Sequence, residues 1–301
     1  MHHPSTAKTQ GVLRPWLFLS PALALILLFL IFPFVLTVVF SFTDQRLVPN
    51  PNVPTEWIGW RNYLRIFENE DFLRTLLNTA YFTVLVVPLQ CGLGLAVAML
   101  INTRLPMRQL FRGIYFLPTV ISMVVVSVIW FSLFQLGGFF NTLLSALSMG
   151  TLQPVDWLGN PYTAMPAIVL MSAWQGFPFQ MVVYLAGLQS INADLYEAAR
   201  LDGANRWNEF RHVTMPGLLN THILVVMTTT ILAFKLFTQV ELLTKGGPSG
   251  VTDTLVRFIY LTGFRQGKVG IAAAAAVVFF LIVLGISLVQ RRLVKEERAI
   301  E

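Results

Sequence analysis

Charged residues are scarce in this sequence. Only 12% of its 301 residues are Asp, Glu, Lys or Arg, whereas 55% are hydrophobic. Soluble domains carry about 25% charged residues. A chain with so few charges cannot cover a surface that faces water on every side, so part of its surface must face lipid. The composition excludes an ordinary soluble domain and predicts an all-α integral membrane protein.

Cysteine and the common catalytic motifs are also missing. Cys91 is the only cysteine, so no internal disulfide can form. The sequence contains no G-x-x-x-x-G-K-[ST] loop for the phosphates of ATP and no H-E-x-x-H zinc pair. It also lacks a compact set of nucleophile, base or metal-ligand residues. We therefore expect the chain to bind no nucleotide, metal or other cofactor itself and to catalyse no reaction.

The formal net charge of +6 does not indicate a nucleic-acid partner. The basic residues lie in short clusters beside apolar runs rather than along one continuous stripe. That placement is typical of residues that set the orientation of membrane helices, and lipid is the partner that it predicts.

Six apolar segments are each long enough to cross a membrane, which takes about 20 residues. The fifth segment is the least regular because it contains Thr228, Thr230, Lys235 and Gln239. The first is too long for a cleaved signal peptide and is expected to remain as an anchor. We predict one membrane domain (1–301) with transmembrane helices at 16–40, 78–101, 114–134, 164–188, 218–243 and 269–289.

The basic clusters predict which side of the membrane each loop faces. The segment 135–163 contains no Lys or Arg, which is typical of an outer loop. We therefore expect a cytoplasmic N-terminus (1–15), where His2 and His3 are uninformative, a cytoplasmic loop (189–217) and a cytoplasmic tail (290–301). The basic residues on that side are Lys8, Arg14, Arg104, Arg108, Arg112, Arg200, Arg206, Arg211, Arg291, Arg292, Lys295 and Arg298.

The cytoplasmic loop is too long for a bare connection between two helices, which takes about 2–8 residues. Asn192 can cap one short helix, and Gly203 suits the left-handed residue that ends it. Asn205 can cap a second helix, which Pro216 limits. The loop therefore predicts two short helices joined by a turn. Such a hairpin either lies on the lipid headgroups or forms a stiff knob that docks into a soluble partner.

The residues of this loop carry a specific resemblance. Glu197-Ala198-Ala199, with Gly203 four residues after Ala199 and then Pro216, resembles the EAA loop of ABC-importer permeases. The longer string EAARLDGANRWNEFRHVTMPGLL is similar to the sugar and glycerol-phosphate branch of that family. Two further stretches resemble the family in the same order along the chain, FRGIYFLPTVIS and AFKLFTQVELLTKGGP followed by TLVRFIY.

The resemblance implies a fold, partners and contact residues. The fold is the type I ABC-importer permease architecture with a cytoplasmic coupling helix, in the bacterial plasma membrane. The implied partners are a homologous second permease, two ATP-hydrolysing subunits that bind ATP and Mg, and an extracytoplasmic solute-binding protein. The expected contacts with the ATPase are Glu197, Ala198, Ala199, Arg200, Asp202 and Gly203, whereas Trp207 and Phe210 are expected to pack on the chain's own spans.

Polar residues inside the predicted spans are candidates for a solute path, because they are costly in lipid. We expect Lys235 and Gln239 in the fifth span and Trp174, Gln175 and Gln180 in the fourth to line a path for a sugar, oligosaccharide or polyol. Other interpretations remain open: Lys235 can reach the membrane surface, and Trp174 can pack against a neighbouring helix. Gln90 is a weaker candidate.

Two other functions compete with an importer subunit. An ion-coupled secondary transporter is expected to show inverted repeats and acidic residues inside its spans. Glu241 is the only acidic residue near a span, at its outer end. An intramembrane enzyme requires the catalytic residues that the sequence lacks.

Overall fold

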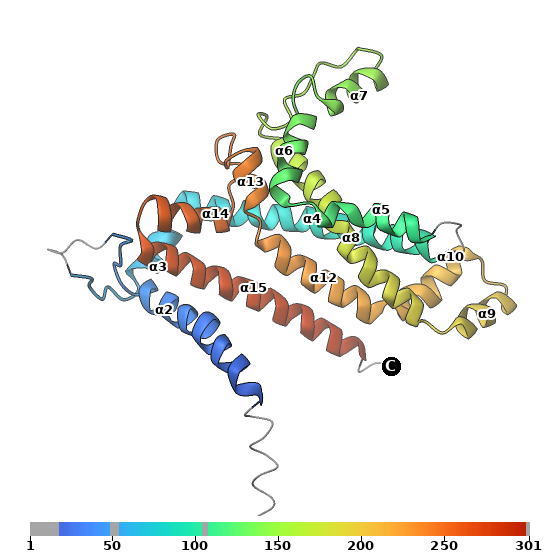
Figure 1. Cartoon of the computed structure of the whole chain (residues 1–301), viewed down its shortest axis with the longest axis horizontal. Coiled ribbons are helices and arrows are strands. Elements are labelled where there is room, and N and C mark those ends of the chain that lie inside the picture. The colour runs from blue at the N-terminus through green and yellow to red at the C-terminus, as the bar shows by residue number, and fades with distance from the viewer. Residues whose placement is uncertain (1–17, 49–53, 104–107, 299–301) are drawn as a thin grey trace, which may run out of the picture. The chain divides into compact units, whose positions relative to one another are not determined.

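The computed structural model describes residues 18–48, 54–103 and 108–298, and these residues are almost entirely helical (Figure 1). The one β interaction among them is an isolated bridge between Thr43 and Trp57. This confirms the predicted all-α class. The expected cytoplasmic N-terminus (1–15), with His2 and His3, and the basic residue Arg104 lie outside the described residues.

The chain divides into two compact units, and the single membrane domain (1–301) remains a prediction. Among the described residues, unit 1 contains 18–48, 54–68 and 259–278, and unit 2 contains 69–103, 108–258 and 279–298. The long final helix α15 (Val269–Arg298) contributes its first part to unit 1 and its last part to unit 2.

Unit 1 contains the first apolar helix, which runs without interruption from Phe18 to Ser41 and includes η1 (Leu27–Ile31) and α2 (Phe32–Ser41). None of its most apolar stretch is buried within the chain, as expected for a helix that faces lipid. The short helix α3 (Arg61–Phe67) and the turn η3 (Leu261–Arg265) complete this unit.

Unit 2 is built around α4 (Glu70–Asn102) and α8 (Ala164–Ser190), which pack extensively against each other, and α12 (Leu219–Phe234) contacts both. Gly94 permits this approach, because a Cβ atom there would lie 2.7 Å from Cβ of Gln180. Small residues at such positions let membrane helices pack closely. The buried core between these helices includes Phe82, Met171 and Tyr184.

The remaining elements of unit 2 are shorter, and only some of them pack on this core. Figure 1 shows α6 and α7 projecting from one side of α4 and α8, and α9 and α10 at one end of α8. These elements are α5 (Arg108–Val120), α6 (Met123–Leu133), α7 (Phe139–Leu147), α9 (Ala193–Leu201), α10 (Arg206–Glu209), η2 (Phe210–Thr214), α11 (Met215–Gly217), α13 (Thr238–Leu243) and all but the last two residues of α14 (Leu255–Tyr260).

Two of the six predicted spans are interrupted rather than continuous. The segment predicted at 114–134 bends by 101° between Val120 and Met123. In the segment predicted at 218–243, helix α12 ends at Phe234. A bend of 68° separates α12 from the preceding helical stretch Arg206–Gly217. Four helices are long and apolar enough to cross a membrane, or up to six if each bent pair forms one span. Six crossings therefore remain a prediction.

Two helix ends differ from the predicted bounds. Helix α4 begins at Glu70 rather than at 78, because Asn69 caps it by accepting a hydrogen bond from the Phe72 amide, and Glu70 and Asp71 occupy its first turn. Helix α15 continues to Arg298, beyond the predicted end at 289.

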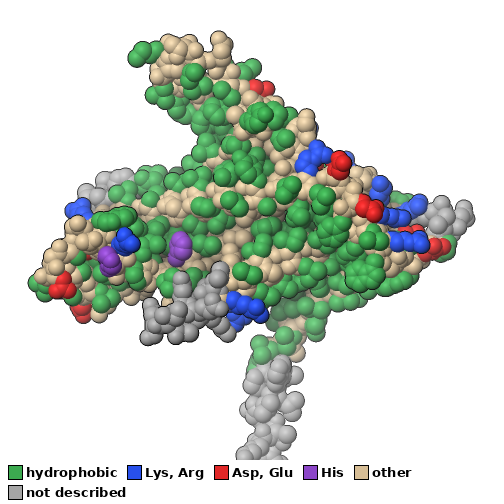
Figure 2. Space-filling view, turned by 180° about the vertical axis from the view of Figure 1, so that it is seen from behind, with side chains coloured by type: hydrophobic (Ala, Val, Ile, Leu, Met, Phe, Trp, Pro, Cys, Tyr) green, Lys and Arg blue, Asp and Glu red, His purple; other side chains and the backbone are tan. Residues whose placement is uncertain are grey.

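Figure 2 shows hydrophobic side chains over most of the visible face, with charged side chains in small groups.

Candidate functional site

The loop predicted at 189–217 folds into two short helical segments joined by a turn, as expected, but Pro216 does not limit the second one, which continues to Gly217. Helices α9 and α10 are followed by η2 and α11, which lead into α12. Residues 193–214 are called the elbow below. Asn192 Oδ1 accepts a hydrogen bond from the Asp194 amide, and Asn205 Oδ1 accepts one from the Asn208 amide. Both predicted caps are therefore confirmed.

The turn between the two helices depends on Gly203. Its φ angle of +82° lies in the left-handed region that favours glycine. Its amide donates to the Arg200 carbonyl, and the Ala204 amide donates to the Ala199 carbonyl, which closes the end of α9. The turn therefore reverses the chain within a few residues.

Two side-chain contacts brace the elbow internally. Arg200 Nε lies 2.7 Å from Glu209 Oε1, which joins α9 to α10. The Tyr196 hydroxyl lies 3.0 Å from Oγ1 of Thr214. The hydrogen bond to Glu209 raises the pKa of Arg200, and the same bond lowers the pKa of Glu209, so both groups remain charged at neutral pH.

The outer surface of the elbow is largely uncovered by the described part of the chain. Helix α9 buries no residue, and Leu201 is 89% exposed. Leu195 is also exposed. The residues predicted to contact the ATPase belong to this surface, namely Glu197, Ala198, Ala199, Arg200, Asp202 and Gly203. Ala199 is partly covered, and the other five are exposed.

The prediction for Trp207 is wrong. Its side chain is 64% exposed and contacts Phe210 at a ring-centroid distance of 5.5 Å, rather than packing on a span. Position 207 lies in the short helix α10, beyond the turn at Gly203. The turn directs this helix so that the indole lies at the surface.

A cavity of about 390 Å³ lies inside unit 2, between the helices of its core. Its wall comes from α4, α5, α6, α8, α12 and α13 and from the break between α12 and α13, so it combines four separate parts of the sequence. The wall residues are Phe82, Val86, Gln90, Thr119, Met123, Ser172, Gln175, Gly176, Phe179, Gln180, Leu232, Ala233, Lys235, Leu236 and Gln239.

Four of the five residues expected on a solute path meet at this cavity, namely Gln175, Gln180, Lys235 and Gln239. Trp174 is not part of its wall. The Trp174 ring packs against Trp130 at 5.6 Å, which is the helix-packing alternative that the sequence left open.

Lys235 lies at a break between two helices and not in the middle of a span. Helix α12 ends at Phe234, α13 begins at Thr238, and the Lys235 side chain is exposed. Lys235 forms no ion pair with any residue in the described ranges. Irregular backbone at membrane depth is tolerated where it lines a cavity or is buried in protein.

Hydrogen bonds inside the wall hold two of its amides. Gln90 Nε2 donates to the Ser172 carbonyl at 2.7 Å. Gln180 Nε2 donates to Thr229 Oγ1 at 2.9 Å and to Gln90 Oε1 at 3.2 Å. Gln175 and Gln239 form no side-chain hydrogen bond within the described part of the chain. Amides both donate and accept, as the hydroxyls of a sugar do.

Sequence reasoning overlooked most of the remaining wall. Gln90 was only a weaker candidate, and Thr119, Ser172 and Phe179 were not singled out. A helical-spacing signal was present, because Ser172, Gln175 and Phe179 follow one another at intervals of three and four residues and share a face of α8. No group of three or more potential metal ligands occurs anywhere in 18–48, 54–103 or 108–298.

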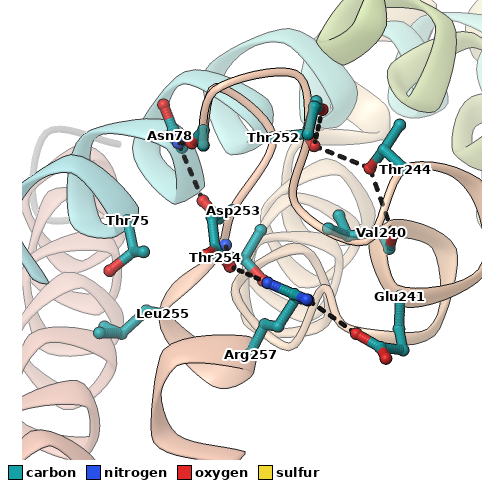
Figure 3. A network of polar contacts seen from close by, with 12 residues as sticks. Thr75, Asn78, Val240, Glu241, Thr244, Thr252, Asp253, Thr254, Leu255 and Arg257 are labelled. Carbon is teal, nitrogen blue, oxygen red and sulfur yellow. Dashed lines mark hydrogen bonds and ion pairs between the residues drawn. The ribbon is translucent and has the colours of Figure 1, made fainter. Parts of the chain in front are cut away.

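A network of charged and polar residues fixes the segment that follows α13 (Figure 3). Arg257 Nε lies 2.7 Å from Glu241 Oε2, and Arg257 Nη1 lies 3.1 Å from Asp253 Oδ1. Burial alone lowers the pKa of Arg257, but the hydrogen bonds and charges of its two partners raise it above the ordinary value. We call Glu241 together with residues 250–257 the clamp.

The clamp is tied to both α4 and the helix break. Asn78 donates to the carbonyls of Gly250 and Asp253 at 2.8 and 2.9 Å. The Leu255 amide donates to Thr79 Oγ1 at 3.1 Å, and Thr254 Oγ1 donates to the Leu236 carbonyl at 2.9 Å. This last bond satisfies a carbonyl within the break between α12 and α13. The clamp therefore positions the break that carries Lys235.

Comparison with known proteins gives consistent results. Residues 90–298 match the family described as "Binding-protein-dependent transport system inner membrane component". The chain is 34% identical to the trehalose/maltose transport system permease protein MalF of Thermococcus litoralis, over 91% of each chain. It is also 34% identical to the lactose transport system permease protein LacF of Rhizobium radiobacter, over 98% of each chain.

A solved structure extends the likeness to three dimensions. The chain resembles a subunit of a bacterial alginate ABC transporter, solved in complex with an alginate pentasaccharide-bound periplasmic protein. The TM-score is 0.81 at 26% identity, and the match covers 95% of this chain and 98% of the other.

Proposed function

This chain belongs to the binding-protein-dependent transport system inner membrane components, in the branch of sugar ABC transporter permeases, and we propose that it forms part of the solute path of an importer. The substrate class that we propose is a sugar, oligosaccharide or polyol. The energy comes from ATP hydrolysis in partner subunits, which bind ATP and Mg, while this chain holds no cofactor. An ion-coupled carrier and an intramembrane enzyme find no support in the family.

The proposed role of the elbow is to transmit movement from an ATPase subunit to the membrane helices. The observation that carries the proposal is an exposed surface on an internally braced hairpin: α9 buries no residue, while Arg200 and Glu209 hold the two helices together. A segment that transmits force must be internally rigid and must present an accessible surface to its partner. Glu197 is proposed to meet a basic residue of the ATPase, and Ala198 and Gly203 to permit close approach.

The proposed solute path passes through the cavity of unit 2. The free amides of Gln175 and Gln239 and the unpaired ammonium of Lys235 provide donors and acceptors for hydroxyls. Phe82 and Phe179 provide apolar surface for a sugar ring. The proposed cycle exposes this cavity alternately to the two sides of the membrane as the ATPases close and reopen.

The proposed assembly contains this chain, a homologous second permease, two ATPases and an extracytoplasmic solute-binding protein. The alginate transporter complex, with its periplasmic protein, supports the last of these partners. We propose that the chain lies in the bacterial plasma membrane with both termini in the cytoplasm, which the basic clusters support.

Site-specific cross-linking tests the role of the elbow, and the chain is well suited to it because its native cysteine, Cys91, is buried. A cysteine introduced by Ala198→Cys is expected to cross-link to the ATPase in membranes. The control is Met149→Cys, whose side chain is 93% exposed in another part of unit 2 and is expected to give no such product. An elbow cysteine that reacts only from the extracytoplasmic side, or cross-links only to lipid, would contradict the proposal.

A further inference from the structure

A second, smaller pocket lies in unit 1, and the proposed function does not use it. It has a volume of about 180 Å³. Its wall residues are Asp44, Gln45, Arg46, Asn62, Arg65, Lys268, Gly270 and Ile271. We call it the basic pocket, because three cationic side chains and one carboxylate surround it.

The three cations have no anionic partner in the structure. Arg46, Arg65 and Lys268 are exposed, and none forms an ion pair with a residue in the described ranges. The single carboxylate, Asp44, already accepts a hydrogen bond from the Glu56 amide at 2.7 Å. The charge around the pocket is therefore positive and favours an anion.

The side chain of Asn62 sets a second requirement for a ligand of the basic pocket. Its side chain is 1% exposed, and its amide nitrogen donates to the carbonyls of Ser41 and Thr43 at 2.9 and 2.7 Å. The amide nitrogen therefore uses both of its hydrogens. The remaining polar atom of the side chain is the oxygen Oδ1, which is buried and has no hydrogen-bond partner among the described residues. A buried acceptor of this kind is rare and calls for a donor. The ligand should therefore combine an anionic group with a hydrogen-bond donor.

The wall of the pocket is held together by its own backbone. The Gly270 amide donates to the Gln45 carbonyl, and the Leu47 amide donates to the Gly267 carbonyl, both at 2.9 Å. These bonds join the segment after α2 to the start of α15. The pocket is therefore a built feature of unit 1 rather than a chance meeting of loops.

The position of the pocket indicates where the ligand comes from. It lies within a few residues of Ser41, which ends one candidate membrane helix, and of Val269, which begins another. Close to it in the chain, the Phe42 ring stacks on Trp57 and meets Trp60 edge to face, and both tryptophans are more than half exposed. Exposed tryptophans at the ends of membrane helices are typical of the level of the lipid headgroups.

We propose that the basic pocket binds the headgroup of an anionic phospholipid that carries a hydroxyl beside its phosphate. The phosphate interacts with Arg46, Arg65 and Lys268, and the hydroxyl donates to Asn62 Oδ1. The excess of positive charge favours a net anionic headgroup over a zwitterionic one. Phosphatidylglycerol has the required combination of groups.

The test uses the full chain purified in mild detergent and measures retained lipid by native mass spectrometry. Wild type is expected to retain phosphatidylglycerol in preference to phosphatidylcholine, which has no donor, and to phosphatidylmethanol, which has the same charge but no hydroxyl. Arg65→Gln is expected to reduce the retention of phosphatidylglycerol about fivefold, since one cation near a membrane surface contributes about that factor. The matched control is Arg61→Gln, on the same helix α3 but outside the pocket wall.

Three results would overturn the proposal. Equal retention of the three lipids by wild type would exclude headgroup recognition. Equal losses in Arg65→Gln and Arg61→Gln would show that only general surface charge matters. Soluble glycerol 3-phosphate that displaced the lipid at equal concentration would identify a site for a free phosphate ester instead.

Discussion

Arg200 and Glu209 lie on different helices of the elbow, and the 2.7 Å bond between Nε and Oε1 joins them across the turn at Gly203. The Glu209 side chain is largely covered, whereas Arg200 extends over the surface. This contact makes the elbow one body rather than two independent helices. In the proposed function, this contact lets force applied at α9 pass to α10 and on to α12.

Exchange of the two charges tests this brace. Arg200→Glu or Glu209→Arg alone places two like charges together, and we expect transport to fall about two- to fivefold, in keeping with the modest strength of exposed ion pairs. The double variant restores the pair and should recover most of the activity. Sugar uptake into cells, normalised to the amount of chain in the membrane, is the measurement. Failure of the double variant to recover would show that the residues act separately.

The brace also predicts a pH dependence. The hydrogen bond from Arg200 lowers the pKa of Glu209 in the folded chain. The contribution of this bond to the stability of the folded elbow is therefore complete above the pKa of about 4.3 that glutamate has in an unfolded chain. It is lost as the pH falls through the lower pKa of Glu209 in the folded chain. We expect the distance between spin labels on α9 and α10 to stay constant from pH 8 to 6 and to broaden in its distribution only in strong acid. Broadening already near pH 6 would contradict this assignment.

Gly203→Asp tests the approach of a partner to the elbow. A Cβ atom at Gly203 meets nothing within 4 Å, and the strain at its φ of +82° is about 1–2 kcal/mol, so the chain should still fold and insert. We nevertheless expect transport to be abolished, because the new carboxylate occupies the proposed contact surface. Transport and membrane insertion are measured together.

The control for that variant is Gly150→Asp. Gly150 has a φ of +78°, and a Cβ atom there also meets nothing within 4 Å, so the backbone strain and the available space are matched. It lies far along the chain from the elbow, and Gly150→Asp should keep wild-type transport. Wild-type transport by Gly203→Asp would be strong evidence against the role of the elbow.

Lys235→Met tests the solute path. If the ammonium of Lys235 donates a charge-assisted hydrogen bond to the solute, its removal should weaken solute binding. The sugar concentration that half-saturates the stimulation of ATP hydrolysis should then rise about ten- to hundredfold. Lys245→Met is the control, since Lys245 is exposed but outside the cavity wall. Unchanged stimulation in Lys235→Met, measured with a panel of sugars, would place the path elsewhere.

Arg257→Met tests the clamp. The change leaves Glu241 and Asp253 without their common cation in a partly buried place, which should destabilise the chain by about 2–3 kcal/mol, somewhat below the cost for a fully buried pair. Thermal unfolding in detergent should show a lower midpoint. Arg265→Met, which removes an exposed arginine with no ion pair in the described ranges, should leave the midpoint unchanged.

The caps and the turn of the elbow were predictable from sequence to the level of single residues. Its caps at Asn192 and Asn205 and its left-handed turn at Gly203 depend on contacts between residues no more than a few positions apart. Local side-chain and backbone chemistry decides such features, so a linear pattern reveals them. The position of Trp207 was not predictable, because the direction of α10 depends on the whole turn.

The sequence by itself determined that the chain enters a membrane, since long apolar segments with few charges have no other stable environment. Only the tertiary structure decided which polar residues meet. Gln90, Gln175 and Lys235 come from three separate parts of the chain and share one cavity, while Trp174, next in sequence to Gln175, points elsewhere. Helix periodicity specifies the face of each residue, but the packing of helices against one another and the clamp at Arg257 specify which faces converge.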